Sequence, residues 1–268
     1  MRASLYAALL ALALSAASAL AQGGEAAAPR NREGGARRVQ DFGDVLVSDY
    51  LARLDSFAVD LLNAPGARGY VVAYIVPNNF PGWPLRRANW ARGYLIRGRG
   101  IDESRVEAVN GGYRDKVGFE FWVVPPGAAL PVAPFDFAAE LSREKSSYLF
   151  DRYFTFTADD TGIESGYVGY LDEKGLYAPF ADALRLDPGA RGCVIAYAAR
   201  RERRGADRRL ASRVKLGILR NHPVGAGRVV ALGGGRRDRR TVEFWVVPPG
   251  SPLPKPTPDV SRTRRGRR

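Results

Sequence analysis

The sequence predicts an α+β fold in which two tandem β-α-β-α-β-β repeats each form a small mixed sheet with helices on one face. The main observation is an internal repeat. Pro65–Gly69 (PGARG) recurs as Pro188–Gly192, and Phe121–Gly127 (FWVVPPG) recurs as Phe244–Gly250, both 123 positions later. Each copy therefore tests the interpretation of the other. The same offset relates three further pairs: Gly111-Gly112 to Gly234-Gly235, Arg105 to Arg228, and Tyr74 to Tyr197.

The elements follow from apolar periodicity and from turn residues. In the first copy, apolar residues at helical spacing over Leu51–Leu62 predict a helix that Asn63–Gly66 ends. The glycine pair of each copy suggests the turn of a β-hairpin between its last two strands. The first copy is expected to have strands at 44–47, 69–76, 105–109 and 117–124 and a second helix at 85–97. The second copy is expected to have strands at 167–171, 192–198, 228–232 and 241–247 and a helix at 206–220.

The ends of the chain have different compositions from its middle. A charged Arg2, an apolar run over Leu5–Leu14 and Ala19-Leu20-Ala21 are typical of a secretory signal, so we expect a periplasmic or secreted protein. No later stretch is long and apolar enough to span a bilayer. The expected organisation is signal 1–21, disordered leader 22–40, repeat one 41–127, aromatic-rich linker 128–165, repeat two 166–250 and disordered basic tail 251–268. The linker is too apolar for a free tether and should pack on the repeats, with a short helix near Ala138–Tyr148.

The charge favours anionic partners. Lys and Arg number 41 against 28 Asp and Glu, giving a net charge of +13 and a pI near 10.2. Such a chain attracts acidic glycans, lipid or cell-wall phosphates, or nucleic acid. Arginine-rich composition throughout a genome would explain scattered arginines equally well. It explains clusters less readily.

Repeat one resembles the OmpA-like (OmpA/MotB C-terminal) domain. The resemblance lies in Arg87–Leu95 (RANWARGYL) followed by Gly100–Val106 (GIDESRV), and in the preceding helix-Pro-Gly-strand. It covers about residues 44–124, and repeat two more faintly. The family implies non-covalent peptidoglycan binding, in which a helix Arg grips a stem-peptide carboxylate and an Asp after the preceding strand holds the ammonium group.

The resemblance maps a site onto repeat one only in part. Arg87 takes the Arg position, and a guanidinium fork suits a carboxylate. Where the family has Asp, this chain has Asn78 and Asn79, which carry no charge to balance an ammonium. The second copy has Leu210 at the position of Arg87. The resemblance therefore implies a ligand site at Arg87, Asn78 and Asn79.

Repeat two carries two arginine runs. The first is expected on a loop and helix start, and its members are Arg200, Arg201, Arg203, Arg204, Arg208, Arg209 and Arg213. The second, Arg236–Arg240 (RRDRR), falls near the last strand. A polyanion-binding surface beside a helix N-terminus and a solvated loop are equally good interpretations of the first run.

The last strand of each copy alternates between two faces. Phe119, Phe121 and Val123 should meet the helices, whereas Trp122 and its counterpart Trp245 should lie on the open face. Tyr74 and Tyr197 are expected beside them. An apolar open face needs a partner. Mutual packing of the two open faces, or cover by the aromatic linker, is favoured over a stacking platform for sugars or bases.

Catalytic signals are sparse. No HExxH, GxSxG or P-loop sequence occurs. The sole histidine, His222, precedes Pro223 in a loop, and the sole cysteine, Cys193, falls in a buried strand. Gly233–Gly235 resembles a phosphate cradle only by glycine content. We therefore expect no enzyme, cofactor or metal site, and interpret the chain as a cell-envelope binding module that binds peptidoglycan through repeat one. A protein-interaction scaffold and a generic polyanion binder are the alternatives.

Overall fold

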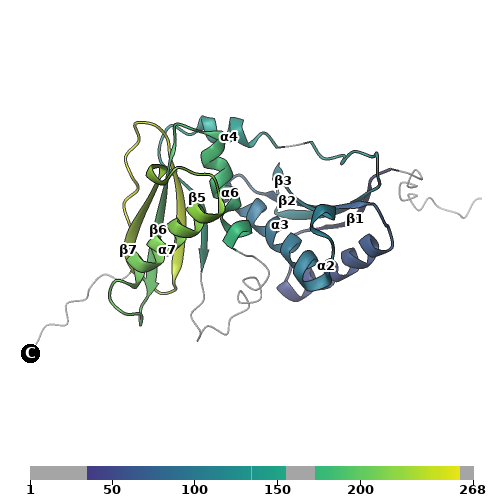
Figure 1. The fold of residues 1–268 in the computed structure, drawn as a ribbon, viewed down its shortest axis with the longest axis horizontal. Helices are drawn as coiled ribbons and strands as arrows, with labels where there is room; N and C mark the ends of the chain where they lie inside the picture. Colours follow the sequence, from purple (N-terminus) through teal and green to yellow (C-terminus); the bar gives the residue numbers. More distant parts are fainter. Residues whose placement is uncertain (1–34, 134, 155–172, 260–268) are drawn as a thin grey trace, which may run out of the picture. The chain divides into compact units, whose positions relative to one another are not determined.

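The computed structural model describes residues 35–133, 135–154 and 173–259. The predicted signal, most of the predicted leader and the strand predicted at 167–171 lie outside them. The described residues from Ala36 onward form one compact unit. Two four-stranded sheets of the same topology confirm the predicted α+β fold class (Figure 1).

The first sheet has the strand order β1-β4-β2-β3. Strand β3 runs parallel to β2, whereas β4 is antiparallel to both of its neighbours. The elements of this repeat are β1 (Arg37–Phe42), α2 (Val47–Leu62), β2 (Arg68–Ile75), α3 (Trp83–Gly93) with the π-helical turn η1 (Tyr94–Gly98), the 3₁₀ turn η2 (Glu103–Arg105), β3 (Val106–Tyr113) and β4 (Gly118–Val124).

The second sheet has the matching order β5-β8-β6-β7. Again one pair is parallel, β6 with β7, and β8 is antiparallel to β5 and β6. The elements are α4 (Phe137–Arg143), β5 (Tyr148–Phe154), α6 (Glu173–Leu186), β6 (Arg191–Ala199), α7 (Ala206–Asn221), the 3₁₀ turn η3 (Ala226–Arg228), β7 (Val229–Arg237) and β8 (Thr241–Val247).

The first strand of each repeat lies upstream of its predicted position. The prediction at 44–47 is wrong, because β1 occupies Arg37–Phe42 and Val47 already begins α2. In the second repeat this role falls to β5, which the predicted linker supplies. Both are edge strands, and the polar residues that suit an edge concealed β1 from a search for apolar periodicity. The leader thus ends before Arg37.

The predicted hairpins are also wrong. Strands β3 and β4 follow one another in sequence, but β2 lies between them in the sheet. Gly69 pairs with Val106 of β3 on one side and with Val123 of β4 on the other. The crossover through α3 allows β3 to join β2 in parallel, which no short turn could do.

The glycine pair serves a bulge within β3 and β7. The register between β2 and β3 shifts between Ala73 and Tyr74, and Gly112 of β3 has a φ of +81°. A Cβ on Gly111 would lie 2.2 Å from the Tyr74 ring, so only glycine allows the ring to cross the strand there. The second repeat shows the same arrangement: a Cβ on Gly234 would lie 2.4 Å from the Tyr197 ring.

Both helical faces of the sheets are apolar cores. Phe119, Phe121 and Val123 face α2 and α3 and belong to the first core, as predicted. In the second core Phe244 packs with Phe180 at a ring separation of 4.9 Å. The linker contributes directly, since Phe137, Leu141 and Phe150 are members of this core. The prediction that the aromatic linker packs on the repeats is therefore confirmed.

In each repeat, an arginine far along the chain donates hydrogen bonds at the C-terminal end of the first helix. Arg105 Nη2 donates to the carbonyl oxygens of Leu61 and Ala64 at 2.7 and 3.0 Å, at the C-terminal end of α2. Arg228 Nη2 donates to the carbonyls of Leu184 and Asp187 at 2.6 and 2.7 Å. Leu61 O also accepts from Ala64 N at 3.2 Å and Asp187 O from Ala190 N at 3.1 Å, so the arginines add charged donors to the turn that ends each helix, where a cation complements the helix dipole.

The face opposite the helices is covered by the chain itself. In the second repeat Leu253 packs against a cluster containing Cys193 and Tyr197. Thr257 N donates to Tyr197 Oη at 3.1 Å. Residues 251–259, here termed the second strap, are therefore placed in the structure, which corrects the prediction of a disordered tail for these residues.

The first repeat has a matching first strap, residues 128–133 and 135. A Cβ on Gly112 would lie 2.6 Å from Phe135, just as one on Gly235 would lie 3.4 Å from Pro258. Phe135 and Pro258 are again 123 positions apart. The first strap is the beginning of the predicted aromatic-rich linker, so the expected cover by the linker holds for the first repeat, whereas the segment after β8 covers the second.

The two repeats contact each other through helices and an edge strand. Arg86 of α3 forms a two-pronged ion pair with Asp151 of β5, with Nε at 2.7 Å and Nη2 at 3.2 Å from the carboxylate oxygens. Gly82 N donates to the Phe150 carbonyl at 2.9 Å. Asn89 Nδ2 donates to the Gly175 carbonyl of α6 at 3.1 Å.

Candidate anion-binding surface on the second repeat

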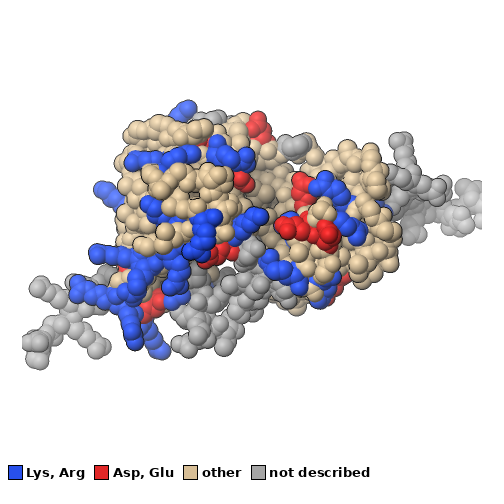
Figure 2. Space-filling model, viewed as in Figure 1, with Lys and Arg blue, Asp and Glu red and all other residues tan. Residues whose placement is uncertain are grey.

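Lysine and arginine side chains gather over the second repeat. Figure 2 shows this concentration around the part of the molecule where β7 and α7 lie, whereas acidic and basic side chains alternate over the first repeat. The structure brings the two arginine runs of the sequence together. Arg200 pairs with Asp238, and Arg240 pairs with Glu202. These ion pairs join the turn before α7 to the end of β7.

The first group of arginines surrounds a hollow at the start of α7, here termed the turn hollow. Its volume is about 270 Å³. Four arginines and one carboxylate line it: Arg203, Arg204, Arg208, Arg236 and Asp207. Asp207 Oδ2 already accepts from Gly235 N at 3.0 Å. Arg203, Arg204 and Arg208 are exposed and form no ion pair with any described residue.

The backbone at the turn hollow adds to its positive potential. Helix α7 begins after Gly205, whose φ of +77° only glycine adopts without strain. No side chain caps this N-terminus. Unpaired backbone N–H groups at the start of a helix carry a partial positive charge. Arginines placed there oppose the helix dipole, so an anion would relieve both charges.

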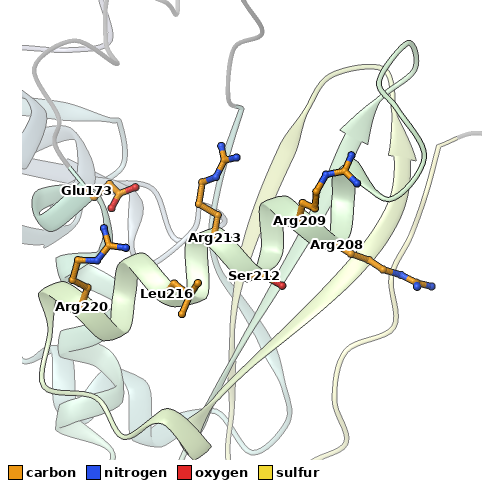
Figure 3. A pocket seen from close by; sticks show the side chains of 7 residues that line it. All are labelled: Glu173, Arg208, Arg209, Ser212, Arg213, Leu216 and Arg220. Carbon is orange, nitrogen blue, oxygen red and sulfur yellow. The ribbon is translucent and has the colours of Figure 1, made fainter.

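The second group forms a stripe along α7. Arg209, Arg213 and Arg220 are separated by four and seven residues, which places them on one side of a helix of about 3.6 residues per turn. Figure 3 shows their side chains extending from the same side of α7, whereas Arg208 extends away from them. They line a shallow hollow of about 600 Å³ together with Glu173, Ser212, Leu216 and Arg208, which lines the turn hollow as well.

The first repeat offers an internal comparison for the turn hollow. The offset of 123 places Phe80, Pro81 and Leu85 at the positions of Arg203, Arg204 and Arg208, and Tyr113 at that of Arg236. The same fold therefore does not require arginine at these positions. Their concentration in one repeat is a local property and not a consequence of the fold.

The predicted site at Arg87 has a different setting. Its side chain is only 15 % exposed and lies 3.7 Å from Asp44. The guanidinium also stacks over the rings of Tyr50, Trp83 and Phe119 at 5.1 to 5.8 Å. It is thus held by residues of its own repeat.

The two asparagines lie in the turn after β2. Asn78 is exposed, and Asn79 Oδ1 accepts from the backbone N–H of Phe80 at 2.8 Å. These contacts stabilise the turn. Among the described residues, neither the asparagines nor any carboxylate bonded to them supplies the negative charge that would balance an ammonium group.

A buried carboxylate on the open face of each sheet escaped the sequence analysis. Glu120 accepts from Tyr74 Oη at 3.0 Å and Trp122 Nε1 at 2.9 Å. Arg114 and Arg38 reach its other oxygen at 2.6 and 3.0 Å. Burial opposes ionisation, but these donors prevail and lower the pKa of Glu120 below its usual range.

The second repeat repeats this network. Glu243 accepts from Tyr197 Oη and Trp245 Nε1, both at 3.1 Å, and pairs with Arg237 and Arg152 at 2.8 Å. Its pKa is likewise lowered. The sequence signal that could have revealed both glutamates is the pattern Glu-x-Trp, which the two strands containing FWVV share. The carboxylate of each glutamate is bound by side chains of its own repeat, so we regard both glutamates as structural.

The remaining candidates have ordinary roles. His222 Nε2 lies 3.0 Å from the Lys174 carbonyl. Cys193 is buried, which raises the pKa of its thiol to about 12 and disfavours the reactive thiolate. Gly233–Gly235 belongs to the bulged strand β7. Among the described residues no group of His, Cys, Asp and Glu could hold a metal ion, and no helix there is long and apolar enough to cross a membrane.

Comparisons with known proteins give the chain no relative. No protein-family model, curated protein or solved structure matches it. The functional argument therefore depends on the geometry of the chain itself.

Proposed function

We propose that this protein is a non-enzymatic polyanion-binding module of the cell envelope or the secreted space. The turn hollow of the second repeat would hold phosphate or carboxylate groups of an envelope polymer. One observation carries the proposal: four arginines line one hollow whose single carboxylate is already bonded to a backbone N–H, and of the four only Arg236 also donates to backbone carbonyls of described residues, those of Ala199 and Arg200.

The chemistry of the hollow suits such a ligand. Guanidinium groups bind phosphate and carboxylate through paired N–H donors, with a geometry that lysine does not provide. The N-terminus of α7 adds backbone donors at the same place. A single phosphate group needs far less than the available 270 Å³, so successive groups of a polymer could enter.

Binding of inorganic polyphosphate, measured by titration at several salt concentrations, tests the proposal. Replacing Arg203 and Arg208 by Ala should weaken binding and lower the slope of log Kd against log salt by about one per arginine. The matched control replaces Arg185 and Arg191, two exposed arginines of the same repeat that line neither hollow. Equal losses of affinity in both double variants would mean that binding depends on net charge alone, which would contradict the proposal.

Peptidoglycan binding through Arg87 is the weaker alternative, because the Arg87 guanidinium already stacks on three rings. Pelleting of the protein with purified sacculi distinguishes the two ideas. Salt-resistant pelleting that Arg87→Ala abolishes would support the carboxylate grip implied by the OmpA-like resemblance. Pelleting that salt abolishes and that Arg203→Ala/Arg208→Ala reduces would support the turn hollow.

A further inference from the structure

The arginine stripe of α7 has a counterpart inside the molecule that shows what this face of the fold can do. The offset of 123 relates α3 to α7 throughout. Arg209 corresponds to Arg86, and Ser212 corresponds to Asn89. Arg209 and Ser212 therefore lie at the same helix positions as Arg86 and Asn89, whereas Arg213 lies at the position of Trp90, which is buried in the first core.

In the first repeat this face is an interface. Arg86 pairs with Asp151, and the two side chains are only 17 % and 4 % exposed. Asn89 binds the backbone of α6 at Gly175. Helix α3 is therefore docked where the edge strand β5 and the beginning of α6 of the next repeat come together.

In the second repeat the same face is exposed. Arg209, Arg213 and Arg220 form no ion pair with any residue that the structure describes. Between them Leu216 is 58 % exposed, one of the few large apolar side chains so placed. An exposed leucine within a row of arginines resembles the centre of a polar-rimmed interface.

The chain also carries a surface of opposite charge. It lies between β1 and the first turn of α2, beside the elements of repeat one that match β5 and α6. We call it the acidic corner, and its members are Asp41, Asp44, Leu46 and Asp49. The register places Gln40, and not an acid of the corner, at the position of Asp151. Leu46 is 70 % exposed, and Asp49 forms no ion pair with a described residue.

The other two acids of the corner have weak or exposed partners. Asp41 pairs with Arg38, with both side chains nearly half exposed. Asp44 is 72 % exposed and lies 3.7 Å from Arg87. An ion pair that is exposed on both sides, such as Asp41–Arg38, contributes little, so the Asp41 carboxylate remains available to an approaching cation. Asp44 is also exposed, although it lies near the largely buried Arg87.

We propose that copies of this chain associate head to tail, with the arginine stripe of one copy docked on the acidic corner of the next. The contact would use the helix and the edge strand that match α3 and β5, with different residues at the interface. Arginines would face aspartates, and Leu216 would pack beside Leu46. Because the two surfaces differ, the association is heterologous and extends into longer assemblies unless it closes into a ring.

Sedimentation velocity of the full chain over a wide concentration range, in low and near-physiological salt, tests this inference. The wild-type chain should exceed dimer mass at high concentration and dissociate as salt rises. Arg213→Glu reverses a charge within the arginine stripe, and Asp49→Lys reverses a charge within the acidic corner. Each variant alone should be monomeric, with association weakened at least about tenfold by like charges.

The mixture of these two variants gives the sharpest result. The intact stripe of Asp49→Lys can still dock on the intact corner of Arg213→Glu. The charge-reversed stripe of Arg213→Glu also faces the charge-reversed corner of Asp49→Lys with opposite charges, so an equimolar mixture should recover dimers and longer assemblies, which also shows that both variants are folded. Arg201→Glu and Asp115→Lys, which make the same charge changes at exposed positions elsewhere, should assemble like the wild type.

Three outcomes would overturn the inference. They are a wild-type chain that stays monomeric at every concentration, a mixture that yields no dimer, and single variants that assemble normally. If the chain stays monomeric while Arg213→Glu weakens binding of inorganic polyphosphate, the stripe is part of the polyanion surface instead. The turn-hollow proposal stands or falls separately through Arg203, which lines the turn hollow but not the hollow beside the stripe.

Discussion

The two repeats keep the same buried carboxylate network but surround it differently. In the second repeat Arg237 is only 9 % exposed and donates to the strap at Thr257, whereas its counterpart Arg114 is 39 % exposed. Each arginine stacks closely over its tyrosine, with 3.3 Å from Arg114 to the Tyr74 ring and 3.5 Å from Arg237 to the Tyr197 ring. Duplication thus preserved the sheet and its bulge, and divergence concentrated on what lies over them.

The second arginine of each network shows how strictly that carboxylate is paired. Arg38 sits opposite Trp122 in the β1 register, but Arg152 sits opposite Glu243 itself in β5. The two strands therefore supply an arginine from different register positions to equivalent glutamates. A buried carboxylate needs this compensation, because an unpaired one would be strongly destabilising.

The largest expected effect tests the difference in burial. Glu243→Gln leaves Arg237 buried without its carboxylate and should lower the free energy of unfolding by about 3 to 5 kcal/mol. Glu120→Gln should cost less, because the exposed Arg114 can be solvated by water. Urea unfolding of both variants measures this. Equal losses would show that the second strap does not shield its network more than the first.

The capping arginines should behave alike in both repeats. Arg105→Ala and Arg228→Ala each remove charged hydrogen bonds to the last carbonyls of a helix, and each should cost about 2 kcal/mol. Replacement by Lys should restore only part of this, because one ammonium group lacks the planar fork. The same urea experiment checks it. A loss confined to one repeat would mean that the two helix ends are not equivalent.

The pH dependence of stability should follow the two glutamates. Their pKa values are lower in the folded than in the unfolded chain, where 4.5 is the ordinary value. Their stabilising contribution is therefore present above about pH 4.5 and is lost as pH falls through the folded pKa values. Thermal unfolding between pH 3 and 7 should show a fall in acid that is shallower in the Glu120→Gln/Glu243→Gln variant. An identical acid transition in wild type and variant would assign it to other carboxylates.

The smallest expected effect concerns the straps. Leu253→Ala removes an apolar contact from the cluster around Tyr197, and it should cost about 1 kcal/mol because Leu253 is only partly buried. Leu130→Ala is its matched counterpart in the first strap. A smaller loss at Leu130 would agree with a more open first network. A larger one would reverse the comparison.

Much of the fold could be predicted because duplication tests each local pattern. Strand β8 occupies the predicted residues 241–247, and α7 begins at the predicted Ala206. The repeat offset fails upstream of the first helices, where residues 43–46 connect β1 to α2 but 155–172 separate β5 from α6. For that reason β5 was hidden in the linker. The predicted hairpins are wrong because the prediction pairs strands that follow one another in sequence. The parallel pairing through a crossover helix depends on packing, which the local sequence does not show.

For the candidate site, the sequence by itself determined the charge, the clusters and their restriction to one repeat. It could not determine which arginines share a hollow, because Arg236 and Arg203 are far apart in the chain and meet only through β7 and α7. Nor could it separate Arg208 from Arg209, which are adjacent in sequence and extend to different sides of one helix. Composition fixes how much charge a chain carries. Tertiary structure decides which charges are neutralised by neighbours, as at Arg87 and Glu120, and which remain for a partner.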